Sequence, residues 1–202
     1  ELNKKLSSIF SGAKFGIRGL RKIFNHNNPI IAPVIKPQGL SCDELSKIAY
    51  NCAIAGADLI KEDHNLSNQN HSPYKERVEK ISLAVKKANK ESGNNCLYFP
   101  HIASNYSDLN EDIKFAKEHN IGGIMLIPSL VGYNLIFSLS RDKNFNLPIL
   151  THPSFSGAYV LSNNTGFSYG MYFGKIQRLI GSDMSIFPNI GGRFQFTKEE
   201  CA

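Results

Sequence analysis

The sequence predicts an α/β protein, built as an incomplete TIM-type (β/α)8 barrel with about six βα units. Six short apolar runs alternate with five amphipathic runs, which is typical of parallel βαβ units. The apolar runs begin roughly 25 to 40 residues apart, close to one βα unit each. Polar and glycine-rich segments follow these runs, where a barrel carries its active site. A doubly wound open sheet is the alternative, although no glycine-rich dinucleotide or P-loop motif follows the first strand.

The strands are expected where apolar residues cluster between turn-forming residues. They cover the ranges 29–36, 57–62, 96–102, 122–127, 147–152 and 184–187. A capping box at Ser41–Glu44 begins the first helix, and Gly56 ends it. Pro73 is expected as the first helical residue of the second helix, which stops at Gly93. The remaining helices are expected at 108–119, 130–141 and 167–180, and a capping box at Thr197–Glu200 begins another.

The two ends of the sequence differ from this pattern. Residues 1–28 have little apolar periodicity and are expected to be the end of an N-terminal domain or a linker. Residues 29–202 are expected to form strands one to six of the barrel. Because a barrel of this type closes with eight strands, the sequence is expected to be a piece of a longer protein, truncated before units seven and eight.

Composition restricts the classes of partner. The chain has 42% hydrophobic residues and a formal net charge of +6, and its lysines are spread out without forming a basic run. Nucleic acid is therefore not expected as a partner, whereas an anionic small molecule suits the charge. No apolar run approaches 18 residues, so a membrane is not expected either. The four cysteines have no C-x-x-C spacing, which favours reduced thiols in a cytoplasmic protein.

Charged residues follow the first two strands. Lys36 ends the first strand, and Lys61 and Asp63 lie on the same side of the second if that strand continues to Asp63. Burial and like charge both lower a lysine pKa. Such a lysine can act as a base or react with CO2 to form a carbamate, which can bind Mg2+ beside Asp63. A solvated turn, or lysines that are simply salt-bridged, is the alternative reading.

Several segments together resemble the large subunit of RuBisCO. They are Phe10–Ile17, Val34–Ser41, Gly56–Asp63, Gly181–Asp183 and Gly191–Arg193. The resemblance extends in a consistent order over nearly all 202 residues and implies the first six βα units of that family's C-terminal barrel.

The resemblance implies roles for individual residues. Lys61 matches the lysine that becomes carbamylated, Asp63 matches a metal ligand, and His64 falls where that family has a glutamate ligand. Lys36 matches the acid/base lysine of enolisation, and His152 matches a catalytic histidine after the fifth strand. Three further residues are expected to bind substrate: His101, Gly191 and Gly192. The glycines could offer backbone N–H groups to an anion, although a simple flexible loop is the alternative.

The departures from the family pattern also matter. Pro153 and Ile186 replace phosphate-contacting residues, and Gln38 stands where a second lysine is expected. Arg193 replaces the lysine that stabilises added CO2 and is expected to bind a carboxylate or phosphate as a catalytic residue. The imidazole of His64 suits Mn2+ or Zn2+ better than Mg2+. Together these changes favour a RuBisCO-like protein over a carboxylase.

The expected function is metal-dependent enolisation of a phosphorylated keto-sugar or keto-sugar acid. The full-length protein is expected to be a homodimeric decarboxylase, transcarboxylase or isomerase that uses Mg2+, or Mn2+ or Zn2+, with CO2 bound as a lysine carbamate. This chain alone is expected to be inactive, because the resemblance implies that strands seven and eight and a partner subunit complete the site. Ribulose bisphosphate carboxylation and a non-catalytic fragment remain the alternatives.

Overall fold

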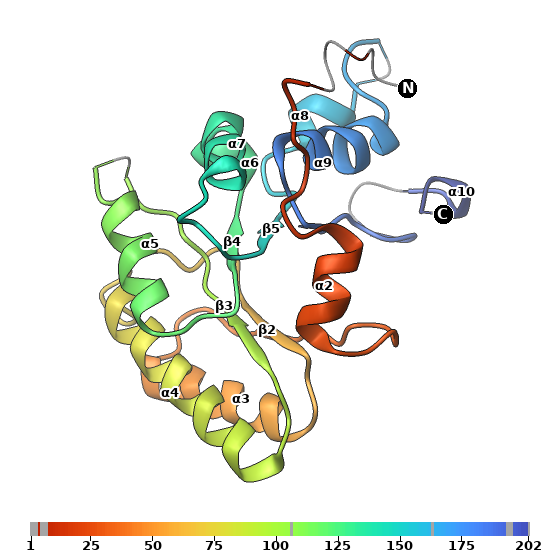
Figure 1. Cartoon of the computed structure of the whole chain (residues 1–202). Coiled ribbons are helices and arrows are strands. Elements are labelled where there is room, and N and C mark those ends of the chain that lie inside the picture. Colours follow the sequence, from red (N-terminus) through yellow and green to blue (C-terminus); the bar gives the residue numbers. More distant parts are fainter. Residues whose placement is uncertain (1–3, 5–7, 106, 163, 193–195, 202) are drawn as a thin grey trace. The chain divides into compact units, whose positions relative to one another are not determined.

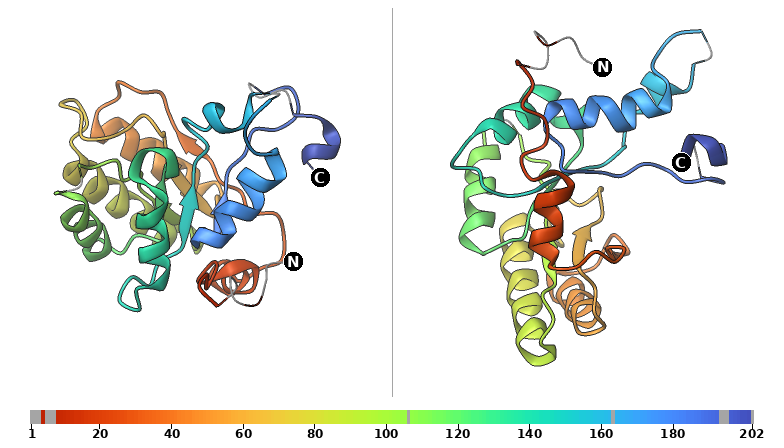
Figure 2. Two further views of the ribbon diagram at one scale, coloured as in Figure 1. Left: turned by 90° about the horizontal axis from the view of Figure 1, so that it is seen from above. Right: turned by 45° about the vertical axis from the view of Figure 1, so that its right-hand side comes forward.

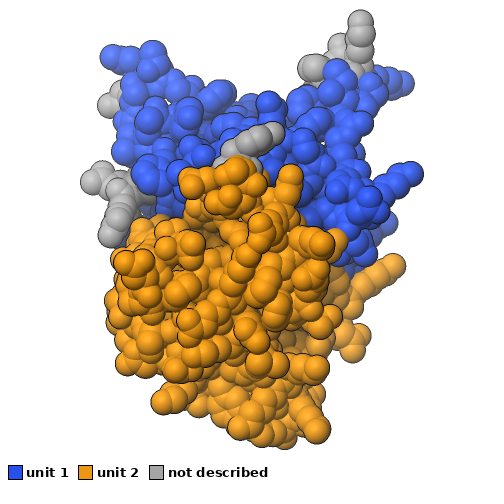
Figure 3. Space-filling model, turned by 90° about the vertical axis from the view of Figure 1, so that its left-hand side faces the viewer, with its two compact units in different colours: residues 1–20, 126–202 blue, residues 21–125 orange. Residues whose placement is uncertain are grey.

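In the computed structural model, short strands alternate with helices along the chain (Figures 1 and 2). The structure describes residues 4, 8–105, 107–162, 164–192 and 196–201. The chain divides into two compact units, one of residues 21–125 and one of residues 1–20 with 126–202 (Figure 3).

A parallel sheet forms the centre of unit 21–125. Its strands are β1 (Val34–Ile35), β2 (Leu59–Glu62) and β3 (Leu97–Phe99), in that order across the sheet. Beyond β3, His101 pairs in parallel with Met125 of β4 (Ile124–Leu126). The predicted alternation of parallel strands with helices is therefore confirmed. The first strand is much shorter than the predicted 29–36, since Pro29 and Pro33 have no N–H group to donate to a ladder.

Three helices of this unit lie along the same side of β2 and β3 (Figure 1). They are α3 (Cys42–Ile54), α4 (Tyr74–Ser92) and α5 (Leu109–Glu118). The capping box that begins α3 is confirmed, because the Ser41 side chain accepts from the Glu44 N–H and the Glu44 side chain accepts from the Ser41 N–H. Pro73 was expected as the first helical residue of α4 and is instead its N-cap, because its ψ of 139° is extended. Gly93 ends α4 with a φ of 76°, as predicted.

The core of this unit is the layer between sheet and helices. Ile60, Leu45 and Ile81 contribute fully buried apolar side chains from β2, α3 and α4. The approach to β4 is close enough to require glycine, because a Cβ on Gly123 would lie 2.1 Å from Phe99 Cε1. The tight packing fixes the carboxyl ends of β1 to β3, where the charged residues follow.

The unit formed by residues 1–20 and 126–202 contains a second parallel sheet. It contains β5 (Ile149–Thr151) and β6 (Met184–Ser185) in the order β4–β5–β6, and the His152 N–H donates to the Leu126 carbonyl. Its helices after β4 are α6 (Pro128–Val131), α7 (Tyr133–Arg141), α8 (Gly157–Val160), the π-helix η1 (Gly170–Ile176), α9 (Gln177–Ile180) and α10 (Lys198–Cys201). In Figure 2, η1 and α9 follow one another as a single coil.

Two predicted helices differ in this unit. The range 130–141 is two helices, because Gly132 adopts φ 88° and ψ 144° between α6 and α7. The range 167–180 begins later, at Gly170, and its first seven residues wind as a π-helix. The capping box of α10 is confirmed, since the Glu200 N–H donates to Thr197 Oγ1 and the Thr197 N–H donates to Glu200 Oε2.

One helix was not predicted. Residues 16–24 form α2 (Gly16–Phe24), within the range 1–28 that was expected to be the end of an N-terminal domain or a linker. The Asp183 carboxylate accepts from the N–H groups of Phe15 and Gly16 at 2.7 and 3.0 Å. The cap of this helix therefore comes from a residue far away in sequence, which local patterns do not reveal.

None of the helices among the described residues has the length and apolarity needed to cross a bilayer. All four cysteines are free thiols, and Cys42 and Cys52 belong to the same helix, as expected.

Candidate functional site

The charged residues after β1 and β2 lie together in unit 21–125. The parallel register pairs Val34 with Lys61 and Ile35 with Glu62, so Lys36 comes opposite Asp63. Lys36 Nζ lies 3.0 Å from Asp63 Oδ2. The Asp63 side chain is only 5% exposed, whereas that of Lys36 is 57% exposed. The pair thus joins a buried carboxylate to an ammonium that can reach a ligand from solvent.

Lys61 is buried beside this pair. Its residue is 5% exposed, and its Nζ donates to the Glu62 carbonyl at 2.8 Å. Burial, helped by the charge of Lys36 and opposed by the charges of Asp63 and Glu62, lowers the pKa of Lys61 to about 8. About a tenth of Lys61 is therefore a neutral amine at pH 7. A neutral amine is the form that acts as a base or nucleophile.

Asp63 is held ionised in spite of its burial. Burial alone raises a carboxyl pKa, but the Asn65 N–H, 2.9 Å from Oδ1, and the Lys36 ammonium outweigh it, so the pKa of Asp63 falls below its ordinary value. His64 follows at once, with Nδ1 3.6 Å from Asp63 Oδ1 and a side chain that is 29% exposed. Carboxylate and imidazole are thus adjacent, as the sequence predicted.

These residues supply only part of a metal site. Among the described residues, no three His, Cys, Asp or Glu side chains come close enough to hold a metal ion. Asp63 and His64 supply one carboxylate and one imidazole. A carbamate on Lys61 would add the missing anionic oxygens, and with it the set fits a divalent cation.

Sequence reasoning missed the most connected carboxylate, that of Glu62. Its side chain leaves β2 on the face opposite Lys61 and is fully buried. It accepts from Arg77 Nε at 2.7 Å, from the His101 N–H at 2.9 Å and from the Tyr98 hydroxyl. These partners come from different elements, and no local motif connects them. The only sequence signal was an acidic residue inside an apolar strand.

His101, expected to bind substrate, lies just beyond β3 and is 1% exposed. Its Nδ1 lies 2.7 Å from the Leu66 carbonyl, and its buried Nε2 has no hydrogen-bond partner among the described residues. Burial lowers the pKa of His101, and the positive charges of Arg77 and Lys61 lower it further. A neutral imidazole with a spare acceptor nitrogen therefore lies within electrostatic reach of Lys61.

The other predicted site residues belong to the unit formed by residues 1–20 and 126–202. His152 follows β5, and its Nδ1 lies 3.0 Å from Ser154 Oγ. It lines a cavity of about 10 Å³ together with Gln177, whose buried Oε1 has no hydrogen-bond partner in the described ranges. Gly191 and Gly192 form a turn in which the Gly192 N–H donates to the Asn189 carbonyl. Arg193 lies outside the described residues.

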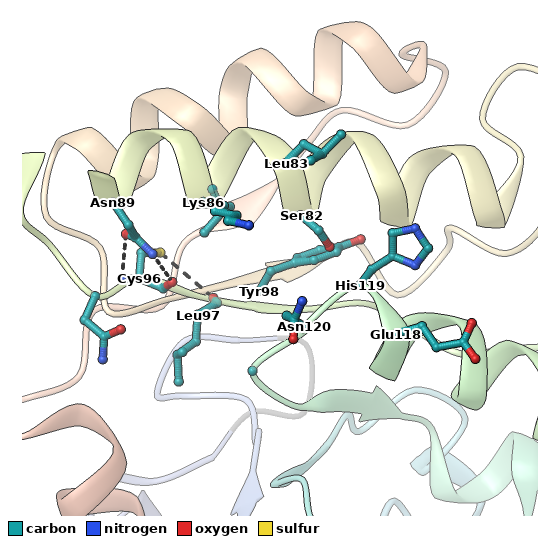
Figure 4. A pocket seen from close by; sticks show the side chains of 13 residues that line it. Ser82, Leu83, Lys86, Asn89, Cys96, Leu97, Tyr98, Glu118, His119 and Asn120 are labelled. Atoms are coloured by element: carbon teal, nitrogen blue, oxygen red, sulfur yellow. Dashed lines mark hydrogen bonds between the residues drawn. The ribbon is translucent and has the colours of Figure 1, made fainter. Parts of the chain in front are cut away.

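A larger cavity of about 640 Å³ lies elsewhere, between α4, α5 and the start of β3 (Figure 4). The side-chain amide of Asn89 makes two hydrogen bonds with the backbone of Cys96. Its Nδ2 donates to the Cys96 carbonyl, and its Oδ1 accepts from the Cys96 N–H. The ring of Tyr98 lines the cavity, although its hydroxyl binds Glu62. Because this cavity lies toward the amino end of β3, away from Lys61 and Asp63, it is not the candidate site.

Gln38, which stands where a second lysine was expected, has a structural role. Its Nε2 donates to the Asn65 carbonyl at 2.9 Å, which ties the segment after β1 to the loop after β2.

The fold and this site define an α/β protein that carries charged residues at the carboxyl ends of its parallel strands, around Lys36, Lys61 and Asp63. Residues 16–196 match the family described as ribulose bisphosphate carboxylase large chain, catalytic domain. The chain belongs to this family, and its relatives are RuBisCO-like proteins.

Three curated relatives illustrate the similarity. The whole chain is 33% identical to ribulose bisphosphate carboxylase-like protein 1 of Rhodopseudomonas palustris, of which it covers 53%. It is 29% identical to 5-methylthioribulose-1-phosphate isomerase of Rhodospirillum rubrum, of which it covers 52%. Over 97% of its length it is 32% identical to 2,3-diketo-5-methylthiopentyl-1-phosphate enolase of Bacillus cytotoxicus, of which it covers 48%. The chain thus spans about half the length of these relatives.

Solved structures agree. The RuBisCO-like protein from Rhodopseudomonas palustris matches with a TM-score of 0.89 and 32% identity, over 100% of this chain and 55% of that one. The RuBisCO-like protein from Alicyclobacillus acidocaldarius matches with a TM-score of 0.91 and 28% identity, over 100% and 51%. The fold is therefore a mixed α/β fold with parallel sheets, like that of RuBisCO-like proteins.

Proposed function

We propose that the full-length protein catalyses metal-dependent enolisation of a phosphorylated keto-sugar or keto-sugar acid. The observation that carries the proposal is the buried Lys61, with its pKa lowered to about 8, beside the Lys36–Asp63 pair. The relatives named as an enolase and as an isomerase both act on phosphorylated compounds, which supports the same substrate class here. An isomerase, a decarboxylase and a transcarboxylase all share this enolisation step.

The residues divide the chemistry among them. Asp63, His64 and a carbamate on Lys61 would hold the divalent cation, which supplies Lewis-acid stabilisation of the enolate oxygen. Lys36, exposed at the end of β1, is the group that exchanges a proton with the substrate. His101 offers its free Nε2 as an acceptor to a substrate hydroxyl. We further propose that His152, Gly191, Gly192 and Arg193 complete substrate binding, in a β/α barrel of which this chain supplies six units.

The test is an assay of the full-length protein with bicarbonate and Mg2+, Mn2+ or Zn2+. The candidate substrates are 2,3-diketo-5-methylthiopentyl-1-phosphate, 5-methylthioribulose-1-phosphate and a phosphorylated 3-keto sugar acid. Lys61→Ala is expected to reduce turnover at least about 100-fold, whereas Lys47→Ala, on the exposed face of α3, should leave it unchanged. Full activity in Lys61→Ala would refute the carbamate. Fixation of CO2 onto ribulose bisphosphate would identify a carboxylase instead.

Metal analysis tests the unusual ligand. If His64 binds the cation, His64→Ala should lose bound metal about 10- to 100-fold more readily than the wild type. His64→Glu should shift the preference from Mn2+ or Zn2+ toward Mg2+. Equal metal content in wild type and His64→Ala would remove His64 from the site.

A further inference from the structure

Arg77 is the largest fully buried side chain of the described residues, and it binds three other residues at once. Its Nε and Nη2 donate to the two carboxylate oxygens of Glu62, at 2.7 and 3.4 Å. Its Nη1 donates to the Ser72 carbonyl at 2.5 Å, and Nη2 also donates to the Ser67 carbonyl at 2.8 Å. Arg77 on α4 therefore fixes both the end of β2 and the loop that follows it.

Glu62 and that loop each form a hydrogen bond with His101, one to its backbone and one to its ring. Glu62 Oε2 accepts from the backbone N–H of His101 at 2.9 Å. The Leu66 carbonyl lies 2.7 Å from His101 Nδ1. Along the chain, Leu66 stands between Glu62 and Ser67, which both accept hydrogen bonds from Arg77. The backbone position and the ring orientation of His101 thus both depend on groups that Arg77 holds.

The contact with Leu66 also fixes the proton on the ring. A carbonyl oxygen can only accept, so Nδ1 must carry hydrogen. Burial and the neighbouring positive charges lower the pKa of His101, which leaves its ring neutral at pH 7. In a neutral imidazole with Nδ1–H, the other nitrogen is a bare acceptor. That atom, Nε2, is buried and has no hydrogen-bond partner within the part of the chain that the structure describes.

We propose that Arg77 is a positioning residue, which holds His101 in its Nδ1–H tautomer so that Nε2 accepts a hydrogen bond from the substrate. A cation held by Asp63, His64 and a carbamate on Lys61 would act on the substrate carbonyl, whereas Nε2 of His101 selects a hydrogen-bond donor, which in a sugar is a hydroxyl. An analogue that lacks this hydroxyl leaves the buried nitrogen unpaired and is disfavoured. The substrate part of this inference rests on the proposed function, whereas the tautomer does not.

The tautomer can be read directly from the ¹⁵N resonances of the histidine rings in the full-length protein. His101→Gln identifies the His101 signals. The wild type is expected to show a protonated Nδ1 and a bare Nε2 at pH 7. A protonated Nε2 would overturn the proposal, whatever activity the protein has.

Arg77→Lys tests the positioning, because it keeps the charge but loses the planar fork that reaches three acceptors. We expect a mixture of His101 tautomers and a fall in kcat of about 10- to 100-fold. The matched control is Val78→Ala, the next residue of α4, which is fully buried but has no polar side chain. It should lower the melting temperature while leaving the tautomer and kcat unchanged.

A single His101 tautomer in folded Arg77→Lys would overturn the positioning role. If Arg77→Lys does not fold, Tyr98→Phe takes its place, since it removes only a hydroxyl that donates to Glu62; it should change the tautomer ratio in the same direction. Because the spectrum needs no substrate, an inactive protein with the expected tautomer would contradict only the proposed function. An active protein with the opposite tautomer would contradict only this inference.

Discussion

Lys36 Nζ lies 3.0 Å from Asp63 Oδ2 although the two residues follow separate strands, β1 and β2. The parallel register of β1 with β2 brings them opposite each other, one step beyond the pairing of Ile35 with Glu62. Burial of the carboxylate and exposure of the ammonium follow from the same register, because β2 has neighbours on both sides while β1 has one in this sheet. The pair makes the region after β2 sensitive to pH.

Asp63→Asn should show that sensitivity. The pKa of Asp63 is lowered in the folded state, so its ionised form stabilises the protein above the unfolded value, and this contribution is lost as the pH falls. The melting temperature of Asp63→Asn should lie below that of the wild type at pH 7, and the difference should shrink below about pH 4.

Asp43→Asn is the control for this experiment. Asp43 also has a lowered pKa, through its hydrogen bond to Lys80, but it is exposed to solvent. Its substitution should change the melting temperature little at any pH, because exposed ion pairs contribute little. A difference for Asp63→Asn that stays constant from pH 7 to pH 3 would contradict the lowered pKa.

Lys61→Met should have the opposite pH dependence. Burial lowers the pKa of Lys61 from 10.5 to about 8, so the folded state is penalised below pH 8, and the penalty disappears as the pH rises above 10.5. The full penalty corresponds to roughly 3 kcal/mol. Relative to the wild type, Lys61→Met should therefore be more stable at pH 7 than at pH 10.5 by an amount of that order.

Denaturant titrations at the two pH values measure this, in buffer free of CO2 so that no carbamate forms. Lys47→Met, which replaces an exposed lysine of α3, serves as the control and should show no such change. An equal pH response of wild type and Lys61→Met would show that Lys61 is not desolvated in solution.

The sequence predicted the charged residues on one face of β2, but it did not predict the role of Glu62 on the other face. Strand periodicity and the family resemblance together predicted that Lys61, Asp63 and Lys36 lie at neighbouring strand ends, and the structure places them there. Glu62 was overlooked, because its partners Arg77 and Tyr98 come from α4 and β3, and a single-strand pattern contains no information on them. Helix α2 was overlooked for the same reason, since its cap is the distant Asp183. Both features depend on contacts between residues that are distant in sequence, and local sequence patterns do not reveal such contacts.

Tyr98→Phe measures the strength of the Glu62 network. The Tyr98 hydroxyl donates to a fully buried carboxylate, and burial together with that carboxylate raises the pKa of the phenol well above its ordinary value. Loss of a buried hydrogen bond to a charged group costs about 1.5–3 kcal/mol. Tyr50→Phe is the matched control, because Tyr50 donates to Glu91 at the surface. The free energy of unfolding should fall for Tyr98→Phe and hardly change for Tyr50→Phe; equal effects would contradict the buried network.

Gly123→Ala tests the close approach between β3 and the start of β4. A Cβ at this position would lie 2.1 Å from Phe99 Cε1, and Phe99 is fully buried, so its ring cannot move aside without disturbing the core. Overpacking of this kind costs about 1–3 kcal/mol. Gly170→Ala is the control, since a Cβ there meets no atom within 4 Å.

Of the two variants, only Gly123→Ala should lower stability. Gly170 begins η1, and alanine in a helix is favoured over glycine by about 0.5–1 kcal/mol. Gly123→Ala should lower the midpoint of urea unfolding, whereas Gly170→Ala should raise it or leave it unchanged. If Gly123→Ala is as stable as the wild type, β3 and β4 are farther apart than the structure shows. His101, which pairs with Met125 two residues after Gly123, would then lose this backbone pairing.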